Sequence, residues 1–202
     1  MIDAVSILKN GGVIVYPTDT AYAIGCDATN ESAVKKIFEI KGRDRAKTLS
    51  LIVADRVMAE NWVLFSERAR ELADEYWPGP LGLVLPLKNQ TLVSAASEEG
   101  YVALRVPDSA IATDLSRKAC VPIVATSANA SGDGPCYSIQ AVRTSLGPAS
   151  AQVDCFVDGG ELLNRGVSTI VKVWDNEVII IRPGAVTLDP STRPPNRRAR
   201  SG

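Results

Sequence analysis

The chain has 202 residues, of which 46% are hydrophobic and 22% are charged, and it contains no histidine. This composition is that of an ordinary globular protein, and the length suffices for one domain with one sizeable core. The absence of histidine excludes Ser-His-Asp and Cys-His triads, HExxH zinc sites and any imidazole base. Any chemistry must therefore use carboxylates, lysine, arginine, hydroxyl groups, the backbone or the substrate itself.

The net charge of −1 is unevenly distributed along the chain. The last twelve positions contain four arginines and no acid, which leaves 18 basic against 23 acidic residues in the rest. We expect residues 189–202 to form a disordered basic tail, because this segment is polar and rich in proline. A basic tail on an acidic body can contact RNA or an anionic partner weakly, and a solvated terminus is the alternative.

The cysteines and the apolar runs indicate the cellular setting. Cys26, Cys120, Cys136 and Cys155 stand far apart without a CxxC pair, so we expect them to be reduced and mostly buried. No apolar run is long enough to cross a bilayer, and Asp3 stands where a signal peptide would be basic. We therefore expect a cytoplasmic protein without membrane contact.

Short runs rich in Val, Ile and Leu alternate with helical patterns, which predicts an α/β fold. Helices are expected at Asp3–Lys9, Glu31–Lys41, Arg56–Trp62, Glu67–Trp77, Ser109–Lys118 and Ile139–Leu146. Strands are expected at Val13–Tyr16, Leu49–Val53, Leu81–Leu87, Tyr101–Val106, Ile123–Ala125, Cys155–Asp158, Ser168–Val173 and Val178–Arg182. The last two strands are close enough to form a hairpin, so the sheet should be mixed.

The segment PTDTAYAIG follows the first expected strand directly, at residues 17–25. Its hydroxyl groups and the carboxylate of Asp19 would be presented at a strand end, where α/β sheets bind ligands. Asp19 could there hold an amine or a metal. A turn that the Asp and Thr side chains stabilise is the alternative.

The segment KGRDRAK has a basic residue at every second position, namely Lys41, Arg43, Arg45 and Lys47. An extended backbone would direct all four cations to the same side. A triphosphate would relieve their repulsion, since Arg and Lys are the usual ligands of phosphate groups. A solvated surface loop is the alternative.

The segment VATSANASG, residues 124–132, follows a short apolar run. Small hydroxyl and amide side chains and a glycine at such a position can direct donors at one anion. An ordinary loop whose side chains satisfy their own backbone is the alternative.

Arg105 and Arg182 each stand at the end of an apolar strand pattern. A cation in such a place needs a carboxylate partner, which either the protein or a ligand supplies. The chain has neither a GxxxxGK[ST] loop nor a GxGxxG turn. A bound nucleotide would therefore occupy a site outside the commonest folds.

Several motifs taken in order resemble the YrdC-type threonylcarbamoyl-AMP synthase family: PTDTAYAIG, KGRDRAKTLSLIV, WPGPLGLVL, ALRVPD, VATSANASG, STIVKV and IIRPGAV. The resemblance implies a twisted mixed β-sheet with flanking helices and a concave basic face, formed by residues 1–188 as one catalytic domain. It implies an enzyme that condenses L-threonine, bicarbonate and ATP to threonylcarbamoyl-AMP and pyrophosphate. The product would go to a tRNA-modifying transferase complex that makes threonylcarbamoyladenosine.

The same resemblance implies roles for individual residues. The threonine site would contain Thr20, Arg105, Ala125 and Ser168. The ATP site would contain Lys41, Arg43, Lys47, Ser127, Asn129 and Arg182, with Lys41 and Arg43 also catalytic. Mg²⁺ would accompany ATP, and no protein side chain is assigned as its ligand.

Two departures from the family pattern stand out. This chain has Lys47-Thr48-Leu49 where many members read KPL, and Tyr22-Ala23 where many have Tyr-Gly. The first departure would change the rigidity of the loop, because proline fixes φ. Two other functions stay open at this point: an RNA-binding module without synthase activity, and a paralogue that acts on another carbamoyl or acyl adenylate.

Overall fold

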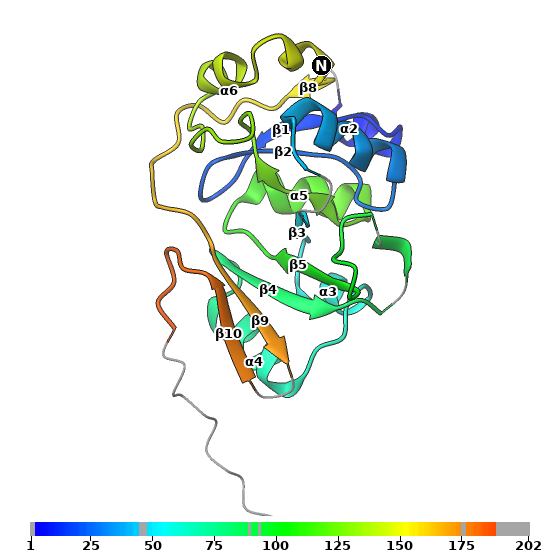
Figure 1. Ribbon diagram of the computed structural model, residues 1–202, viewed down its shortest axis with the longest axis vertical. Helices are drawn as coiled ribbons and strands as arrows, with labels where there is room; N and C mark the ends of the chain where they lie inside the picture. Colours follow the sequence, from blue (N-terminus) through cyan, green and yellow to red (C-terminus); the bar gives the residue numbers. More distant parts are fainter. Residues whose placement is uncertain (1–2, 45–47, 89, 93, 175–176, 189–202) are drawn as a thin grey trace, which may run out of the picture.

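The computed structural model describes residues 3–44, 48–88, 90–92, 94–174 and 177–188, and it has the expected α/β architecture (Figure 1). The strands divide between two mixed sheets. One has four strands in the order β7-β2-β1-β8, and the other has six in the order β10-β9-β4-β5-β3-β6. The predicted basic tail, residues 189–202, lies outside the described residues.

The four-stranded sheet forms around the first hairpin. Strand β1 (Ile14–Pro17) pairs antiparallel with β2 (Tyr22–Gly25) and parallel with β8 (Cys155–Phe156). Strand β7 (Thr126–Ser127) pairs antiparallel with the other edge of β2. All residues of β1 and β2 are buried. Sequence reasoning treated β2 as part of a binding turn, whereas the structure makes it a central strand.

The six-stranded sheet contains most of the predicted strands. Its members are β3 (Ser50–Ile52), β4 (Leu81–Pro86), β5 (Tyr101–Arg105), β6 (Ile123–Val124), β9 (Thr169–Trp174) and β10 (Glu177–Arg182). Strands β9 and β10 pair antiparallel, as the predicted hairpin requires, and β4 pairs antiparallel with β5 and parallel with β9.

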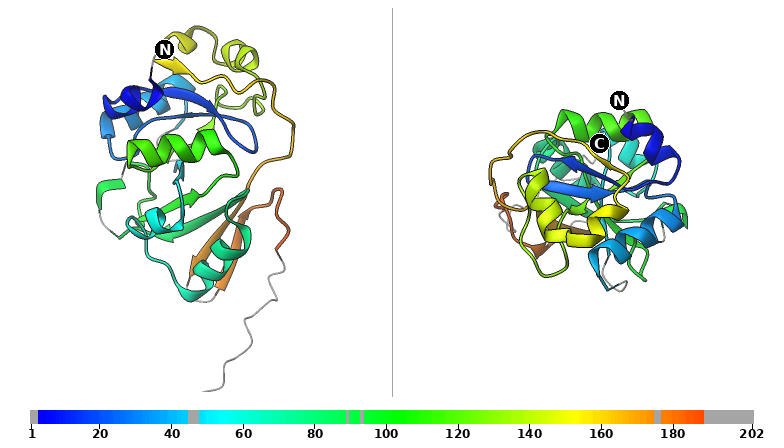
Figure 2. Two further views of the ribbon diagram at one scale, coloured as in Figure 1. Left: turned by 180° about the vertical axis from the view of Figure 1, so that it is seen from behind. Right: turned by 90° about the horizontal axis from the view of Figure 1, so that it is seen from above.

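Helices flank both sheets, and Figure 2 shows α4 lying on the back of the six-stranded sheet. The α-helices are α1 (Ala4–Lys9), α2 (Glu31–Lys41), α3 (Arg56–Glu60), α4 (Glu67–Tyr76), α5 (Ala110–Ala119) and α6 (Ile139–Leu146). Two short 3₁₀ segments, η1 (Gln90–Leu92) and η2 (Gly147–Gln152), complete the elements found in the described residues. All six helices were predicted to within a few residues.

Side-chain caps explain where the helices begin. The Asn30 side chain accepts a hydrogen bond from the amide of Ala33 at the start of α2, as its sequence position suggests. Asp3, Asp55, Ser66, Ser109 and Ser138 cap the other α-helices in the same way. Helix α2 ends at Lys41, and its C-cap is Gly42, whose φ of 57° lies in the left-handed region that glycine adopts at little cost.

The expectation that the cysteines are mostly buried is confirmed for only two of the four. All four cysteines are free, and Cys26 and Cys136 are buried, but Cys120 is exposed and Cys155 is partly exposed. Within the described residues, no helix has the length and apolarity needed to span a membrane.

Candidate functional site

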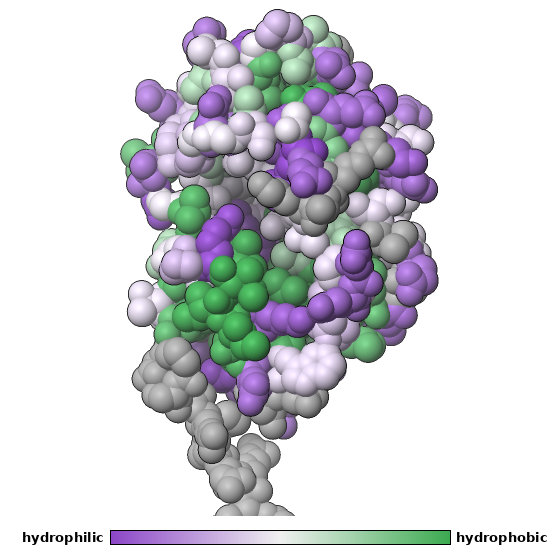
Figure 3. All heavy atoms as spheres, in the orientation of Figure 1, coloured by the Kyte–Doolittle hydropathy of each residue, from purple (hydrophilic) through white to green (hydrophobic). Residues whose placement is uncertain are grey.

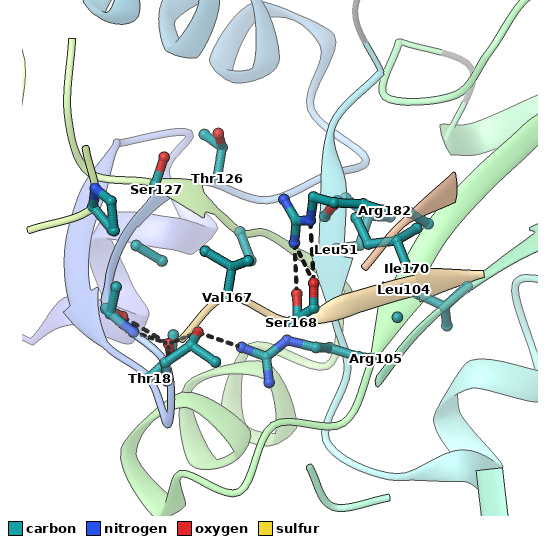
Figure 4. Close-up of a pocket in the computed structure, with 18 of the residues that line it drawn as sticks. Thr18, Leu51, Leu104, Arg105, Thr126, Ser127, Val167, Ser168, Ile170 and Arg182 are labelled. Carbon is teal, nitrogen blue, oxygen red and sulfur yellow. Dashed lines mark hydrogen bonds between the residues drawn. The ribbon is translucent and has the colours of Figure 1, made fainter. Parts of the chain in front are cut away.

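A cavity of about 330 Å³ lies where the two sheets meet (Figure 4). Residues from β2, β3, β4, β5, β7, β9 and β10 contribute to its lining. Seven of the residues singled out from the sequence line it, which are Thr20, Arg43, Arg105, Ala125, Ser127, Ser168 and Arg182. Segments that are far apart in the chain therefore converge on one site.

One short segment crosses between the sheets and forms a wall of the cavity. Strand β6 pairs with β3 of the larger sheet, and β7, which begins two residues after β6 ends, pairs with β2 of the smaller sheet. Ala125 lies at the crossing, where its amide donates to the carbonyl of Ser50 at 2.8 Å. Where the sequence suggested a strand followed by a turn, the chain therefore passes from one sheet to the other. Ser127, at the end of β7, is exposed and lines the cavity.

The turn between β1 and β2 is held by Thr18. Its hydroxyl donates to the carbonyl of Ala21 at 2.7 Å and accepts from the amides of Thr20 and Ala21 at 3.2 Å. Thr18 therefore stabilises the turn with its side chain, as the alternative interpretation of this segment expects. The adjacent Thr20 lines the cavity, where its hydroxyl accepts a hydrogen bond from Arg105 at 3.2 Å.

The buried partner of Arg105 is Asp19. Nη1 of Arg105 lies 2.7 and 2.9 Å from the two carboxylate oxygens and 3.2 Å from the carbonyl oxygen of Gly79. The side chains of Arg105 and Asp19 are only 10% and 6% exposed. The protein itself thus supplies the carboxylate that a buried guanidinium requires, and the Gly79 carbonyl helps to fix the orientation of the guanidinium.

Arg182 reaches back from the end of β10 to Ser168, as Figure 4 shows. Its Nε and Nη2 donate to the Ser168 carbonyl at 3.1 and 2.8 Å, and Nη2 also lies 2.8 Å from the Ser168 hydroxyl. Partial burial lowers the pKa of Arg182, and the neighbouring charges of Arg105 and Arg43 lower it further. Three guanidinium groups therefore line one cavity, and their positive charge favours an anionic ligand.

Arg43 follows the left-handed turn that ends α2. Nη1 donates to the Thr126 hydroxyl at 3.3 Å, and Nη2 donates to the carbonyl of Thr48 at 3.0 Å. Burial lowers the pKa of this guanidinium, and its Nε is buried with no hydrogen-bond partner among the described residues. The predicted cations Arg45 and Lys47 lie outside the described residues.

Lys41 ends α2, as the predicted helix Glu31–Lys41 requires, so it does not share the extended backbone that would direct the four cations to one side. Lys41 is the last residue of α2, where the helix places its side chain under the loop that follows β7. Its ammonium donates to the carbonyl of Ser127 and to that of Asn129, the latter at 2.7 Å. Burial, with a further contribution from Arg43, lowers the pKa of Lys41 to about 8. Lys41 is absent from the described lining of the cavity.

Asn129 also supports this loop from within. Its side-chain amide donates to the carbonyls of Ala130 and Asp133, each at 2.8 Å, and the residue is 5% exposed. The amide of Ser131 donates to the carbonyl of Lys41 at 3.0 Å. Asn129 does not appear in the described lining of the cavity either. Lys41 and Asn129 thus hold in place the backbone that carries Ser127.

The sequence matches a known family over nearly its whole length. The Sua5/YciO/YrdC family model, described as telomere recombination, matches residues 6–184. The chain belongs to the Sua5/YciO/YrdC family. Its α/β fold with two mixed sheets is accordingly the fold of this family.

Individual family members agree with this assignment. The threonylcarbamoyl-AMP synthase of Bacillus subtilis is 36% identical over 92% of this chain and 54% of its own length. The structure of Pyrococcus abyssi Sua5 complexed with L-threonine matches 90% of this chain and 53% of that chain, with 33% identity and a TM-score of 0.80. Escherichia coli YciO matches 93% and 90% of the two chains, with 25% identity and a TM-score of 0.82. This chain therefore spans about half the length of the first two relatives.

Sequence reasoning missed the apolar part of this cavity. Gly82 and Val84 of β4, together with Ile170 and Ile181, also line the cavity. The signal was the glycine in the run Leu81–Pro86, since glycine within a strand often marks a close approach of a ligand or backbone. Without the strand order, nothing in the sequence indicated which face of β4 was open.

The cavity offers little to hold a metal ion by protein groups alone. The described residues contain no cluster of three or more His, Cys, Asp and Glu side chains. Asp133 is the one carboxylate in the described lining, and it accepts a hydrogen bond from the Ser145 hydroxyl at 2.6 Å. Mg²⁺ commonly uses one or two carboxylates together with substrate phosphates and water. The residues present therefore fit a metal ion that arrives with a phosphate ligand.

Proposed function

We propose that this chain is an L-threonylcarbamoyl-adenylate synthase, which condenses L-threonine, bicarbonate and ATP to threonylcarbamoyl-AMP and pyrophosphate. The observation that carries the proposal is the convergence of Arg43, Arg105 and Arg182 on one cavity between the two sheets. The names of the related synthases and the threonine-bound relative support it. We place the reaction in the cytoplasm, and its product would pass to the tRNA-modifying transferase complex that forms threonylcarbamoyladenosine.

The threonine site, on this proposal, lies around Arg105. Asp19 and Gly79 hold one terminal nitrogen of the guanidinium, and the other terminal nitrogen contacts Thr20 beside the cavity. A guanidinium fixed in this way can bind the carboxylate of an amino acid without losing its protein partners, because it has five donors. Ala125 and Ser168 would complete the threonine pocket, the former by leaving room and the latter through its hydroxyl.

The ATP phosphates would lie toward Arg43, Arg182 and Ser127, which line the same cavity. Lys41 and Asn129 would support ATP binding through the loop whose carbonyl groups they contact. Lys47 stays a proposed phosphate ligand outside the described residues. Mg²⁺ would enter with ATP and neutralise phosphate charge.

The chemistry needs no histidine. The amine of threonine reacts with bicarbonate to give a carbamate and water, and a carbamate oxygen then forms a bond to the α-phosphorus of ATP. The bond from the α-phosphorus to the bridging oxygen breaks, and pyrophosphate leaves. Arg43 and Arg182 would stabilise the charge that develops on the phosphates. Holding the reactants in this geometry can lower the barrier by about 7–11 kcal/mol.

The decisive experiment measures pyrophosphate release in the presence of threonine, bicarbonate, ATP and Mg²⁺. We expect release that depends strictly on threonine and bicarbonate and that is lost in Arg105→Ala. Arg117→Ala serves as the matched control, because Arg117 is 54% exposed on α5 and pairs only with Asp114 among the described ion pairs. Equal release with serine, or without any amino acid, would contradict the substrate assignment. Steep salt-dependent RNA binding without turnover would favour an RNA-binding module instead.

A further inference from the structure

Strand β10 forms an open edge of the six-stranded sheet. Within the described residues it pairs only with β9, so the outer row of its backbone N–H and C=O groups faces away from the sheet. Such an edge can pair with another strand. Proteins usually protect an edge with lysine, proline or a bulge; residues 177–182 contain neither lysine nor proline, and the one register shift described in β10 lies at its Arg182 end.

The side chains of β10 make this edge unusually apolar. Ile179, Ile180 and Ile181 are 50%, 40% and 57% exposed. Figure 3 shows a hydrophobic surface gathered over β9 and β10. Large exposed apolar patches of this kind mark interaction sites more often than free surface.

The isoleucines point to both faces of the sheet. Ile179 lies opposite Lys172, and Ile180 lies opposite Val171, which is fully buried on the other face. Since opposed residues of an antiparallel pair share a face, Ile179 and Ile180 project to opposite sides. A ligand lying on one face of the sheet could not cover both residues. A strand placed alongside β10 would cover both.

We propose that β10 pairs antiparallel with β10 of a second copy of this chain, which joins the two six-stranded sheets into one. A pair centred on Ile179 places Glu177 of each copy opposite Ile181 of the other and next to its Arg182. The register of β9 and β10 shifts between Ile180 and Arg182, so Arg182, opposite Ile170, lies on the same face of the sheet as Glu177, opposite Trp174. The charges at the two ends of β10 are thus complementary in an antiparallel pair and would clash in a parallel one.

The sequence of residues 189–202 does not suit the same role. It contains Pro190, Pro194 and Pro195, which have no N–H to donate, and no Ile, Leu, Val or Phe to cover the isoleucines. A second β10 supplies both a complete row of donors and matching apolar side chains. This inference does not require the proposed activity, although Ile181 and Arg182 at one end of β10 also line the cavity.

Sedimentation equilibrium of the full chain across a dilution series tests the association. We expect a dimer for the wild type and a monomer for both Ile179→Lys and Ile180→Lys, because each lysine charge would be buried in the new strand pair. Val57→Lys is the matched control, since Val57 is an apolar residue 71% exposed on α3, and this variant should remain dimeric. Circular dichroism and thermal unfolding would verify that each variant is folded.

Disulfide trapping tests the register. In a pair centred on Ile179, the two Cα atoms at this position lie about 4.5–5.5 Å apart, which is within the range of a disulfide. We expect Ile179→Cys, in a Cys120→Ser background, to form a covalent dimer under mild oxidation, and Val57→Cys in the same background to stay monomeric. A monomer throughout the dilution series, a dimer that both lysine variants leave intact, or equal trapping at position 57 would each overturn the proposal.

Discussion

Cations lie on both sides of the cavity, but the two sides use them differently. On the side of the four-stranded sheet, Lys41 is buried beneath the β7 loop and donates to backbone carbonyl groups. On the side of the six-stranded sheet, Arg105 and Arg182 reach the cavity itself from the ends of β5 and β10. A cation can therefore support the backbone of a site, as Lys41 does, or face the cavity, as Arg105 and Arg182 do. The position at which its helix or strand ends decides between these two roles.

The chemistry of the two side chains explains this division. An ammonium group has three donors, and Lys41 uses two contacts to hold the carbonyls of Ser127 and Asn129. A guanidinium has five donors in a planar fork, so it can bind a protein partner and a ligand at once. The predictions that follow test whether Lys41 acts through structure, and Arg105 and Arg182 through direct contact.

The largest effect is expected for Arg105→Ala. Removing the guanidinium leaves the buried Asp19 carboxylate without its partner, which should cost about 3–5 kcal/mol of stability. Threonine binding should weaken more than binding of a non-hydrolysable ATP analogue, and calorimetry with each ligand measures this order.

Two further variants separate an effect on threonine binding from an effect of Arg105→Ala on folding. Arg105→Lys keeps a charge near Asp19 but loses the planar fork, and it should still weaken threonine binding about tenfold or more. Asp19→Asn keeps the guanidinium, and it should retain threonine binding better than Arg105→Lys. Calorimetry that shows ATP binding weakened more than threonine binding would contradict this role and indicate that Arg105 contacts the nucleotide.

A smaller effect is expected for Lys41→Met. This change removes two hydrogen bonds from a buried ammonium, and bonds of charged groups contribute about 1.5–3 kcal/mol each, although part is regained because a desolvated charge is also removed. We expect a lower midpoint of thermal unfolding together with weaker ATP binding.

Arg182→Gln is the matched comparison for Lys41→Met. Arg182 belongs to the exposed residues and contacts only Ser168 among the described hydrogen bonds, so this variant should weaken ATP binding with little change in the unfolding midpoint. Equal loss of stability in both variants would remove the distinction between the two sides of the cavity.

The smallest effect concerns the pH dependence of stability. The pKa of Lys41 falls from the ordinary 10.5 to about 8 in the folded chain, so between these values the unfolded chain binds more protons. The free energy of unfolding therefore rises with pH between these two pKa values. Below the lower value, the folded chain bears the full cost of burying the charged Lys41 ammonium. The wild type should gain on the order of 1–2 kcal/mol relative to Lys41→Met between about pH 7 and about pH 9.5. Urea unfolding at both pH values measures this gain, and a constant or shrinking difference would contradict it.

Local patterns in the sequence located the elements well. The alternation of apolar runs and amphipathic segments predicted all six α-helices and most of the strands, and Asn30 predicted the start of α2. These features depend on neighbouring residues, which a single sequence displays directly. Strand β2 escaped because its pairing partners, β1 and β7, include a segment about a hundred residues away.

The sequence by itself determined which residue types were available to the site: arginines at strand ends, small hydroxyl residues after β6, and no histidine. Only the tertiary structure decided that Asp19 is the partner of Arg105, that Lys41 supports the β7 loop from below, and that β10 is left with an open edge. These outcomes depend on how the two sheets meet and on the order of their strands. Such long-range contacts are fixed by the packing of the whole chain, and no local pattern records them.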